Sequence, residues 1–218
     1  MRTIAFATQK GGSGKSTLAI GLAIAAVQDG ERVAMLDTDP QGTIANWGLR
    51  RGSPEPSIIR ILYAFQVGSS LRSLAAKGYT LSIIDTAAGA DRTLTSAAIL
   101  AADLCIVPTR PSVPDVEATH PTLKVIRGFE KPLAFVLNQT AARYEPTDAA
   151  APLHAVGALA FPFIVLRNDH QNALGAGLGV SEFAPHGKAA EEIRELWTWV
   201  KRKLDIPVPA DHEQALVA

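Results

Sequence analysis

The sequence contains a single cysteine, Cys105, among its 218 residues. One cysteine cannot form a disulfide within the chain, which excludes the small disulfide-stapled folds and is typical of proteins from a reducing cytosol. Cys105 lies inside the apolar run Leu104–Val107, and no neighbouring residue would stabilise a thiolate. We therefore interpret Cys105 as a buried structural residue and not as a nucleophile.

A net charge and long apolar segments are also missing. The 21 Lys and Arg residues balance 21 Asp and Glu residues, so contact with nucleic acid has to rest on a local patch. No apolar run approaches the roughly 18 residues that span a bilayer. The chain begins directly on a strand-like run, from which we expect no signal peptide. These features predict a cytoplasmic globular protein. We also expect no membrane partner, because the C-terminal ending is proline-interrupted and acidic and does not form a basic amphipathic helix.

Strand-like apolar runs alternate with helical patterns along the chain. Such alternation predicts an α/β fold, a doubly wound and mostly parallel sheet flanked by helices. We expect one domain over residues 1–204 and a proline-broken tail over 205–218. The predicted strands are Thr3–Ala7, Val33–Leu36, Leu81–Ile84, Leu104–Val107, Leu133–Leu137 and Leu159–Phe163. The predicted helices are 16–29, 42–50, 68–77, 92–101, 114–128, 145–155 and 188–204, while Ser57–Ala64 fits either state.

A glycine-rich stretch separates the first predicted strand from the first predicted helix. Glycines allow backbone N–H groups to approach phosphate oxygens closely, and a helix start adds unpaired N–H groups with a positive dipole end. Within this stretch, Lys15 is placed to reach β- and γ-phosphates and the Ser16 hydroxyl to hold Mg²⁺. The predicted nucleotide-binding residues are Gly11, Gly12, Ser13, Gly14, Lys15, Ser16 and Thr17.

The stretch departs from the ordinary P-loop, because Gln9 stands where the first glycine is usual and an extra lysine, Lys10, precedes Gly11. This pattern is the deviant Walker A motif, and on it the chain resembles the ParA/MinD family of ATPases. The resemblance implies a P-loop ATPase that uses ATP and Mg²⁺. It extends over nearly the whole chain to about Leu204 and is most specific in the first ninety residues.

Two carboxylates, Asp37 and Asp39, follow the second predicted strand in the run Asp37–Gly42. Because ligands of doubly wound sheets bind beyond the carboxyl ends of the strands, both lie on the edge of the phosphate loop. The run resembles the second signature of the family, which implies that Asp39 orients or activates the attacking water and that Asp37 lies near the Mg²⁺ shell. Alternatively, Asp39 caps the next helix ahead of Pro40.

Asp85 follows the third predicted strand. An apolar strand that ends in a carboxylate is typical of a Walker B motif, in which the carboxylate holds Mg²⁺ through water. Ala87 stands where the family usually has proline, which leaves the stiffness of the following loop in question. Asn138 follows a later strand and resembles the family's adenine-reading residue, although a turn-forming Asn is the competing interpretation. Asp115 resembles a residue of the family's dimer interface and also suits the first turn of a helix.

In the family, the first lysine of the loop crosses to the phosphates of the partner subunit. The resemblance therefore implies that Lys10, with Lys15 and Asp39, is catalytic, and that ATP drives formation of a homodimer. A monomer or weak dimer is expected with ADP. We also expect an ATPase-stimulating partner protein, because a catalytic group contributed by a second subunit makes intrinsic hydrolysis slow.

Among subfamilies, the sequence is most similar to the short ParA class, which binds DNA non-specifically and positions a plasmid or another large cargo. Such a protein would be nucleoid-associated when ATP-bound. A phosphate-binding patch and a solvated helix end compete as explanations for the basic residues near the C-terminus. The candidate cations are Arg167, Lys188, Arg194, Lys201, Arg202 and Lys203, and we expect the neighbouring Trp197 and Trp199 to be core residues.

Two other functions remain open. A P-loop synthetase of the dethiobiotin or cobyrinate type would use the same loop on a small carboxylate, although the double-lysine loop and the Asp37–Gly42 run argue against it. A regulatory nucleotide-binding module with negligible turnover is the third possibility. Loss of the hydrolytic carboxylate would indicate such a module, but Asp39 is present. The sequence does not identify the cargo.

Overall fold

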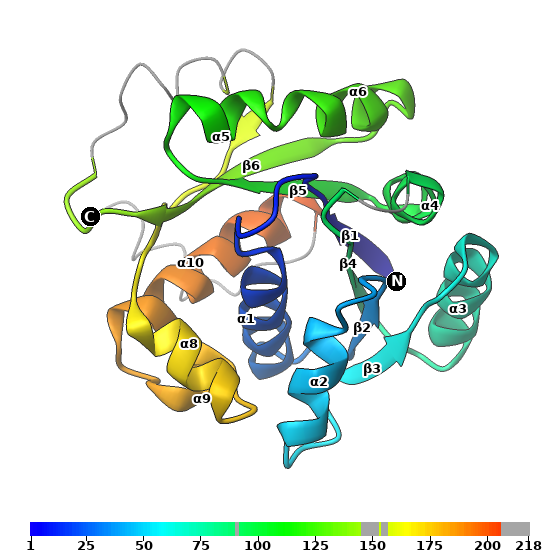
Figure 1. Cartoon of the computed structure of the whole chain (residues 1–218). Helices are drawn as coiled ribbons and strands as arrows, with labels where there is room; N and C mark the ends of the chain where they lie inside the picture. Colours follow the sequence, from blue (N-terminus) through cyan, green and yellow to red (C-terminus); the bar gives the residue numbers. More distant parts are fainter. Residues whose placement is uncertain (90–91, 145–152, 154–156, 206–218) are drawn as a thin grey trace.

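The computed structural model describes all residues except 90–91, 145–152, 154–156 and 206–218. Its centre is an eight-stranded sheet in the order β3-β2-β4-β1-β5-β6-β7, with β8 paired to β6, and each recorded pairing is parallel. This arrangement confirms the predicted doubly wound parallel sheet (Figure 1). The strands are β1 Arg2–Phe6, β2 Val33–Asp37, β3 Ser57–Arg60, β4 Leu81–Asp85, β5 Leu104–Thr109, β6 Leu133–Thr140, β7 Ala158–Leu159 and β8 Ile164–Val165.

Helices cover both faces of the sheet (Figure 1). One face packs against α1 Lys15–Gln28, α2 Thr43–Arg50, α8 Asn168–Gly175, α9 Val180–Phe183 and α10 Lys188–Lys203. The other packs against α3 Ala64–Ala76, α4 Arg92–Ala101, α5 Val113–Glu117 and α6 His120–Gly128. Because both faces are covered, the inner strands are apolar along nearly their whole length, which is why periodicity predicted them well. Among the described residues, no helix combines the length and hydropathy needed to cross a bilayer.

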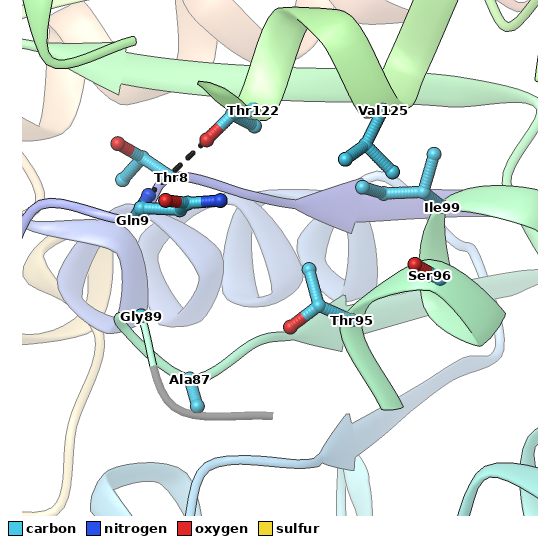
Figure 2. A pocket seen from close by; sticks show the side chains of 9 residues that line it. All are labelled: Thr8, Gln9, Ala87, Gly89, Thr95, Ser96, Ile99, Thr122 and Val125. Carbon is cyan, nitrogen blue, oxygen red and sulfur yellow. Dashed lines mark hydrogen bonds between the residues drawn. The ribbon is translucent and has the colours of Figure 1, made fainter. Parts of the chain in front are cut away.

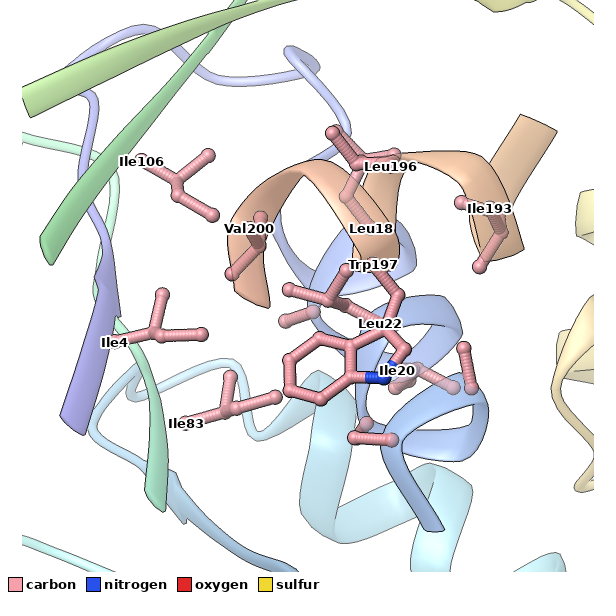
Figure 3. Packing of buried hydrophobic residues seen from close by; sticks show 14 of the residues in the cluster. Ile4, Leu18, Ile20, Leu22, Ile83, Ile106, Ile193, Leu196, Trp197 and Val200 are labelled. Carbon is pink, nitrogen blue, oxygen red and sulfur yellow. The ribbon is translucent and has the colours of Figure 1, made fainter. Parts of the chain in front are cut away.

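The core between the sheet and α1 and α10 is shown in Figure 3, where Ile4 and Ile83 of the sheet face Leu22 and Trp197 of the helices. Trp197 is 3% exposed, as expected for a core residue. Its indole N–H donates to Asp29 Oδ2 at 2.8 Å. This hydrogen bond fixes α10 against the end of α1. The indole thus has both an apolar environment and a hydrogen-bond acceptor.

Several predicted elements differ from the structure. The ambiguous segment Ser57–Ala64 is strand β3 followed, from Ala64, by α3. The predicted helix 114–128 is two helices, because Pro121 in the first turn of α6 cannot continue a helix from α5. The predicted strand Leu159–Phe163 is replaced by the two-residue strands β7 and β8, and the polar helix α8 and the short α9 were not predicted. The predicted helix 145–155, apart from Leu153, and the tail, apart from Asp205, lie outside the described residues.

The sheet brings the chemistry-bearing strand ends to one edge. Phe6 at the end of β1 and Asp37 at the end of β2 are both in register with Asp85 at the end of β4. Strands β2 and β3 lie on one side of β1 in the sheet, and the later strands β5 and β6 lie on the other side. The glycine loop therefore leaves β1 at the topological switch point, where doubly wound sheets bind their ligands.

Candidate functional site

The loop between β1 and α1 has the backbone shape of a phosphate cradle. Gly12 and Gly14 have φ angles of +73° and +84°, in the left-handed region that favours glycine. A Cβ on Gly14 would lie 2.2 Å from Asn138 Nδ2. The Asn138 amide occupies that space because it donates to the Ser13 carbonyl at 2.7 Å. Position 14 therefore accepts only glycine, for reasons of both conformation and space.

Two further side chains brace the same loop, and sequence reasoning missed both. Arg110 Nη2 and Gln139 Nε2 donate to the Gly12 carbonyl at 2.9 Å and 3.1 Å. These donors neutralise a carbonyl that would otherwise repel an anion, which leaves the loop's N–H groups to set the local charge. The available signal was their position, since Arg110 directly follows β5 and Gln139 lies near the end of β6.

The two residues that begin α1 lie at the carboxyl edge with Asp85. The Ser16 hydroxyl donates to Asp85 Oδ2 at 2.6 Å. Lys15 is 7% exposed. Burial lowers the pKa of Lys15, while the nearby charges of Asp85 and Asp39 raise it in part. The structure thus brings Ser16, Lys15 and Asp85 together, as the sequence predicted, although their roles remain predictions.

Asp85 is fully buried, and its Oδ1 has no hydrogen-bond partner among the described residues. Burial raises its pKa to about 7, an increase that the Ser16 hydrogen bond and the charge of Lys15 only partly offset. A buried carboxylate oxygen without a partner, beside a hydroxyl, fits the oxygen ligand set that Mg²⁺ prefers. No group of three or more His, Cys, Asp or Glu side chains among the described residues forms another metal site.

The raised pKa of Asp85 predicts how the stability of the protein without nucleotide or metal depends on pH. Between about pH 4 and pH 7 the native state binds a proton that the unfolded state has released, so stability falls as the pH rises through this range. Asp85→Asn removes this dependence and keeps an oxygen for Ser16. We expect the Tm of the variant to exceed that of wild type by several degrees at pH 8 and by a much smaller amount at pH 5. At this chain length, 1 kcal/mol of stability shifts Tm by about 2–4 °C.

Circular-dichroism melts in EDTA at the two pH values measure the effect. A difference in Tm that does not grow with pH would show that Asp85 is ionised at little cost. Because the comparison is between variant and wild type at each pH, titration of groups that do not interact with Asp85 cancels.

Asp37 and Asp39 have different environments. Asp37 is fully buried and accepts from Asp39 N at 3.1 Å and Ala45 N at 2.8 Å. Its Oδ2 therefore caps α2, which begins at Thr43. The alternative prediction that Asp39 caps this helix is wrong, because Asp39 Oδ1 instead accepts from Gln41 N at 2.9 Å within the loop. Asp39 is half-buried at the edge of the site, and only one of its oxygens has a recorded partner.

Burial raises the pKa of Asp37, while the two backbone N–H groups and Arg60 oppose this effect. Arg60 Nη1 lies 3.8 Å from Asp37 Oδ2. The carboxylate of Asp37 thus already accepts hydrogen bonds from the chain itself. Any contribution of Asp37 to a Mg²⁺ shell would have to be made while it caps α2.

Lys10 has a different partner from the carboxylates that act on Lys15. Its Nζ pairs with Asp115 Oδ1 at 2.6 Å, in the first turn of α5, and its side chain is 37% exposed. Burial would raise the pKa of Asp115, but hydrogen bonds from Lys10 and Ser112 outweigh it and lower that pKa. Sequence reasoning placed Asp115 in a first helical turn, which is confirmed, but it did not foresee the pairing with Lys10.

A hollow of about 410 Å³, counted with the space open to solvent, adjoins the loop on the α8 side. Asn138 is one of its lining residues and is 5% exposed, so the residue predicted to read adenine lies in the wall of this hollow, and that role stays a prediction. The other lining residues are Gly14, Thr17, Leu18, Gln139, Val165, Leu166, Arg167, His170 and Gln171.

A second hollow, of about 380 Å³ counted in the same way, lies on the opposite side of the loop between α4 and α6 (Figure 2). Thr122 of α6 accepts from Gln9 N at 3.2 Å across it, and Ala87 and Gly89 form another part of its wall. Ala87 is 5% exposed. The residue that replaces the usual proline therefore lines this hollow and is buried.

The candidate DNA-contacting cations are not equivalent. Lys201 is 2% exposed and pairs with Asp29 at 2.6 Å, so it is a core anchor and the prediction that it contacts DNA is wrong. Arg167 pairs with Glu192 at 2.6 Å. Arg202 and Lys203 are exposed at the end of α10, and Lys203 lies over the Trp199 ring at 5.3 Å. Cys105 is buried, and burial raises its pKa to about 12, which confirms a structural thiol.

Comparison with known proteins identifies relatives over nearly the whole chain. A model described as the CobQ/CobB/MinD/ParA nucleotide binding domain matches residues 4–147. Maintenance of carboxysome distribution protein A of Gloeobacter kilaueensis is 31% identical over 216 residues, covering 94% of each chain. The protein of the same name from Halothiobacillus neapolitanus is 29% identical over 204 residues, covering 89% of this chain and 94% of the relative.

Solved structures agree with this comparison at the level of the fold. A protein of Borrelia burgdorferi B31 bound to AMPPNP superposes with a TM-score of 0.76. It is 19% identical and covers 93% of this chain and 99% of its own. At that identity the similarity establishes the fold alone.

Proposed function

Because the chain belongs to the CobQ/CobB/MinD/ParA nucleotide-binding family, we propose that it is a Mg²⁺-dependent ATPase whose ATP-bound dimer binds DNA non-specifically and positions a large cargo. The observation that carries this proposal is the difference in partner and burial between the two loop lysines. Lys15 is buried close to Asp85, whereas Lys10 is half-exposed and held by Asp115. One lysine thus serves the protein's own nucleotide and the other is available to a second subunit.

The phosphates bind to the glycine loop and to Lys15, whose lowered pKa reflects a buried cation that a phosphate would stabilise. Ser16 and Asp85 would hold Mg²⁺, with Asp37 nearby. The bound ion would neutralise charge on the β- and γ-phosphate oxygens. The N-terminus of α1 adds its N–H groups to the same anion site.

Hydrolysis requires a water held in line with the γ-phosphorus. Asp39 is the candidate, because one of its oxygens is occupied by Gln41 N and its half-buried carboxylate has capacity for another donor. A carboxylate can orient this water and accept its proton. Asn138 and the hollow beside it would hold the adenine.

Lys10 would leave Asp115 and stabilise the γ-phosphate of the partner subunit. The Lys10 side chain is 37% exposed, and Asp115, whose side chain is 11% exposed, keeps the Ser112 hydroxyl as a hydrogen-bond donor when Lys10 leaves, so the exchange does not leave this carboxylate without a partner. Only ATP presents the γ-phosphate, which gives ATP a differential affinity for the dimer over the monomer. A partner protein would stimulate turnover by stabilising the assembled site.

The cargo is proposed from the relatives. Two that cover nearly the whole chain are named for maintenance of carboxysome distribution, and others are named as plasmid or chromosome partitioning proteins. We favour a large particle over a small substrate for this reason. Exposed cations such as Arg202 and Lys203 are candidate phosphate contacts in the dimer, with the nucleoid as the expected location.

Filter binding to a random DNA duplex tests the proposal directly. We expect retention with Mg²⁺ and a non-hydrolysable ATP analogue, little retention with ADP, and a loss of about 10³-fold or more in affinity between 50 mM and 200 mM salt if six or more phosphates are contacted. Equal binding in both nucleotide states, or binding insensitive to salt, would contradict it.

The synthetase alternative is separated by a parallel assay of ATP hydrolysis. DNA added with a candidate partner protein should stimulate a positioning ATPase. Stimulation by a small carboxylate alone would instead favour a synthetase.

A further inference from the structure

Strand β3 forms one end of the sheet and pairs only with β2 among the described strands (Figure 1). The backbone N–H of Ile61, just after β3, donates to the Asp37 carbonyl of β2 at 2.9 Å. Because successive residues of a strand direct their backbone groups to alternate sides, the N–H and C=O groups of Ile58 and Arg60 point away from β2. The edge thus presents donors and acceptors to an additional strand.

A groove runs beside this edge, between β3, α2 and the segment that connects them. It measures about 710 Å³ counted with the space open to solvent. Leu49 of α2 lines this groove and is 85% exposed, so the core does not cover its side chain. Its lining contains two arginines and no carboxylate, and consists of Ala45, Gly48, Leu49, Arg51, Ser53, Pro54, Pro56, Ile58 and Arg60.

The two arginines differ in availability. Arg51 is committed to Glu182 through two hydrogen bonds of 2.8 Å and stacks on Trp47. Arg60 has 38% of its side chain exposed, and its nearest carboxylate, Asp37, is 3.8 Å away. Arg60 therefore retains donors for an acidic ligand.

Arg60 also connects the groove to the candidate hydrolytic loop. Its Nη2 lies 3.5 Å from the Pro40 carbonyl, and a Cβ on Gly42 would lie 2.0 Å from its Nη1. The guanidinium thus packs over the segment that carries Asp39. A group that pairs with Arg60 from outside the sheet would change the environment of this loop.

The geometry points to the outer edge of β3 and its groove as the docking site for an extended segment of the stimulating partner, one that adds as a strand and carries an apolar residue beside a carboxylate. The strand addition satisfies Ile58 and Arg60, the apolar side chain covers Leu49, and the carboxylate pairs with Arg60. The partner's role as stimulator rests on the proposed function, whereas the docking site rests on the edge itself.

A second copy of this chain is a poorer occupant. Two β3 edges brought together about a two-fold axis would place Arg60 of each copy near the other, and like charges across a strand pair are destabilising. An acidic extended segment meets the same edge with complementary charge. It also supplies the donors and acceptors that the edge lacks.

The probe is a blocked heptapeptide, Thr-Glu-Thr-Val-Thr-Glu-Thr, whose valine and glutamates share one face in either strand direction. Amide hydrogen exchange of the full ¹⁵N-labelled chain is measured by NMR with millimolar peptide. We expect slower exchange at Ile58 and Arg60, which face outward, and no change at Ile59, which faces β2. Replacing both glutamates of the peptide by lysine should abolish the effect.

Two variants test the groove. Arg60→Gln should weaken peptide binding about tenfold, as for loss of a hydrogen bond to a charged group. Leu49→Ser, made as a separate variant, should also weaken peptide binding. Leu100→Ser, on a leucine 54% exposed on α4, is the matched control. Unchanged exchange at Ile58 and Arg60, or equal binding of the lysine peptide, would overturn the proposal. None of these measurements uses ATP, so their failure is distinct from failure of the proposed function.

Discussion

Lys10→Ala is expected to abolish dimerisation driven by a non-hydrolysable ATP analogue, while binding of the analogue to the monomer is retained. The reason is that Lys15 is buried, whereas Lys10 is partly exposed and pairs with Asp115. Removing its cation leaves the cradle of one subunit intact and deprives the γ-phosphate of the other subunit of a donor. Hydrolysis should fall on the order of 100-fold or more, as for loss of one preorganised donor to a transition-state charge.

Sedimentation velocity with the ATP analogue and with ADP measures the first effect, and single-turnover hydrolysis measures the second. Two controls accompany the variant. Lys77→Ala removes an exposed lysine at the opposite edge of the sheet, and Asp115→Asn removes the partner of Lys10 but not its charge. Both should dimerise as wild type does. Equal dimerisation of Lys10→Ala would refute the contribution of this lysine to a second subunit.

Most of the fold could be predicted because its strands are buried on both faces. Nearly continuous apolar runs such as Val33–Leu36 and Leu81–Ile84 differ from the observed β2 and β4 only by a terminal aspartate. The errors fall where the pattern carries less information. The segments β7 and β8 have two residues each, and α8 is a polar helix whose few core contacts leave no clear apolar stripe.

The candidate site was predictable in composition but not in its contacts. A strand, a glycine-rich turn and a helix fix where Ser16 and Asp85 meet, and the structure brings them within 2.6 Å. The contact between Lys10 and Asp115 spans 105 positions of sequence and depends on where α5 packs, which no local pattern specifies. Arg110, which braces Gly12 from beyond β5, escaped notice for the same reason.

The capping of α2 illustrates how tertiary structure overrides a local signal. An aspartate before a proline, as in Asp39-Pro40, is a common start of a helix. Here the chain continues through a left-handed Gly42 and starts α2 at Thr43, and the cap comes from Asp37 at the end of β2. The outcome matters for function, since Asp39 is thereby released from a structural role in the helix.

This release underlies the second large effect. Asp39→Ala should reduce ATP hydrolysis by about 10²–10⁴-fold, the range for loss of a positioned general base. ATP binding should persist, because the cradle, Ser16 and Asp85 make no recorded hydrogen bond to the Asp39 side chain. If ATP binds and is not consumed, the ATP-bound dimer should accumulate with ATP itself, where wild type needs a non-hydrolysable analogue.

Single-turnover hydrolysis and sedimentation of the same sample separate the two parts of this expectation. Gln41→Ala is the matched control, since it removes an exposed side chain of the same loop and leaves the backbone N–H that Asp39 accepts from. Slow hydrolysis in both variants would indicate that the loop's conformation, and not the carboxylate, is what matters. Loss of ATP binding in Asp39→Ala would instead mean that the carboxylate helps to build the cradle, because its charge is one of those that act on Lys15. Slow hydrolysis with a stable ATP dimer, seen for Asp39→Ala alone, is the outcome that a water-positioning carboxylate requires.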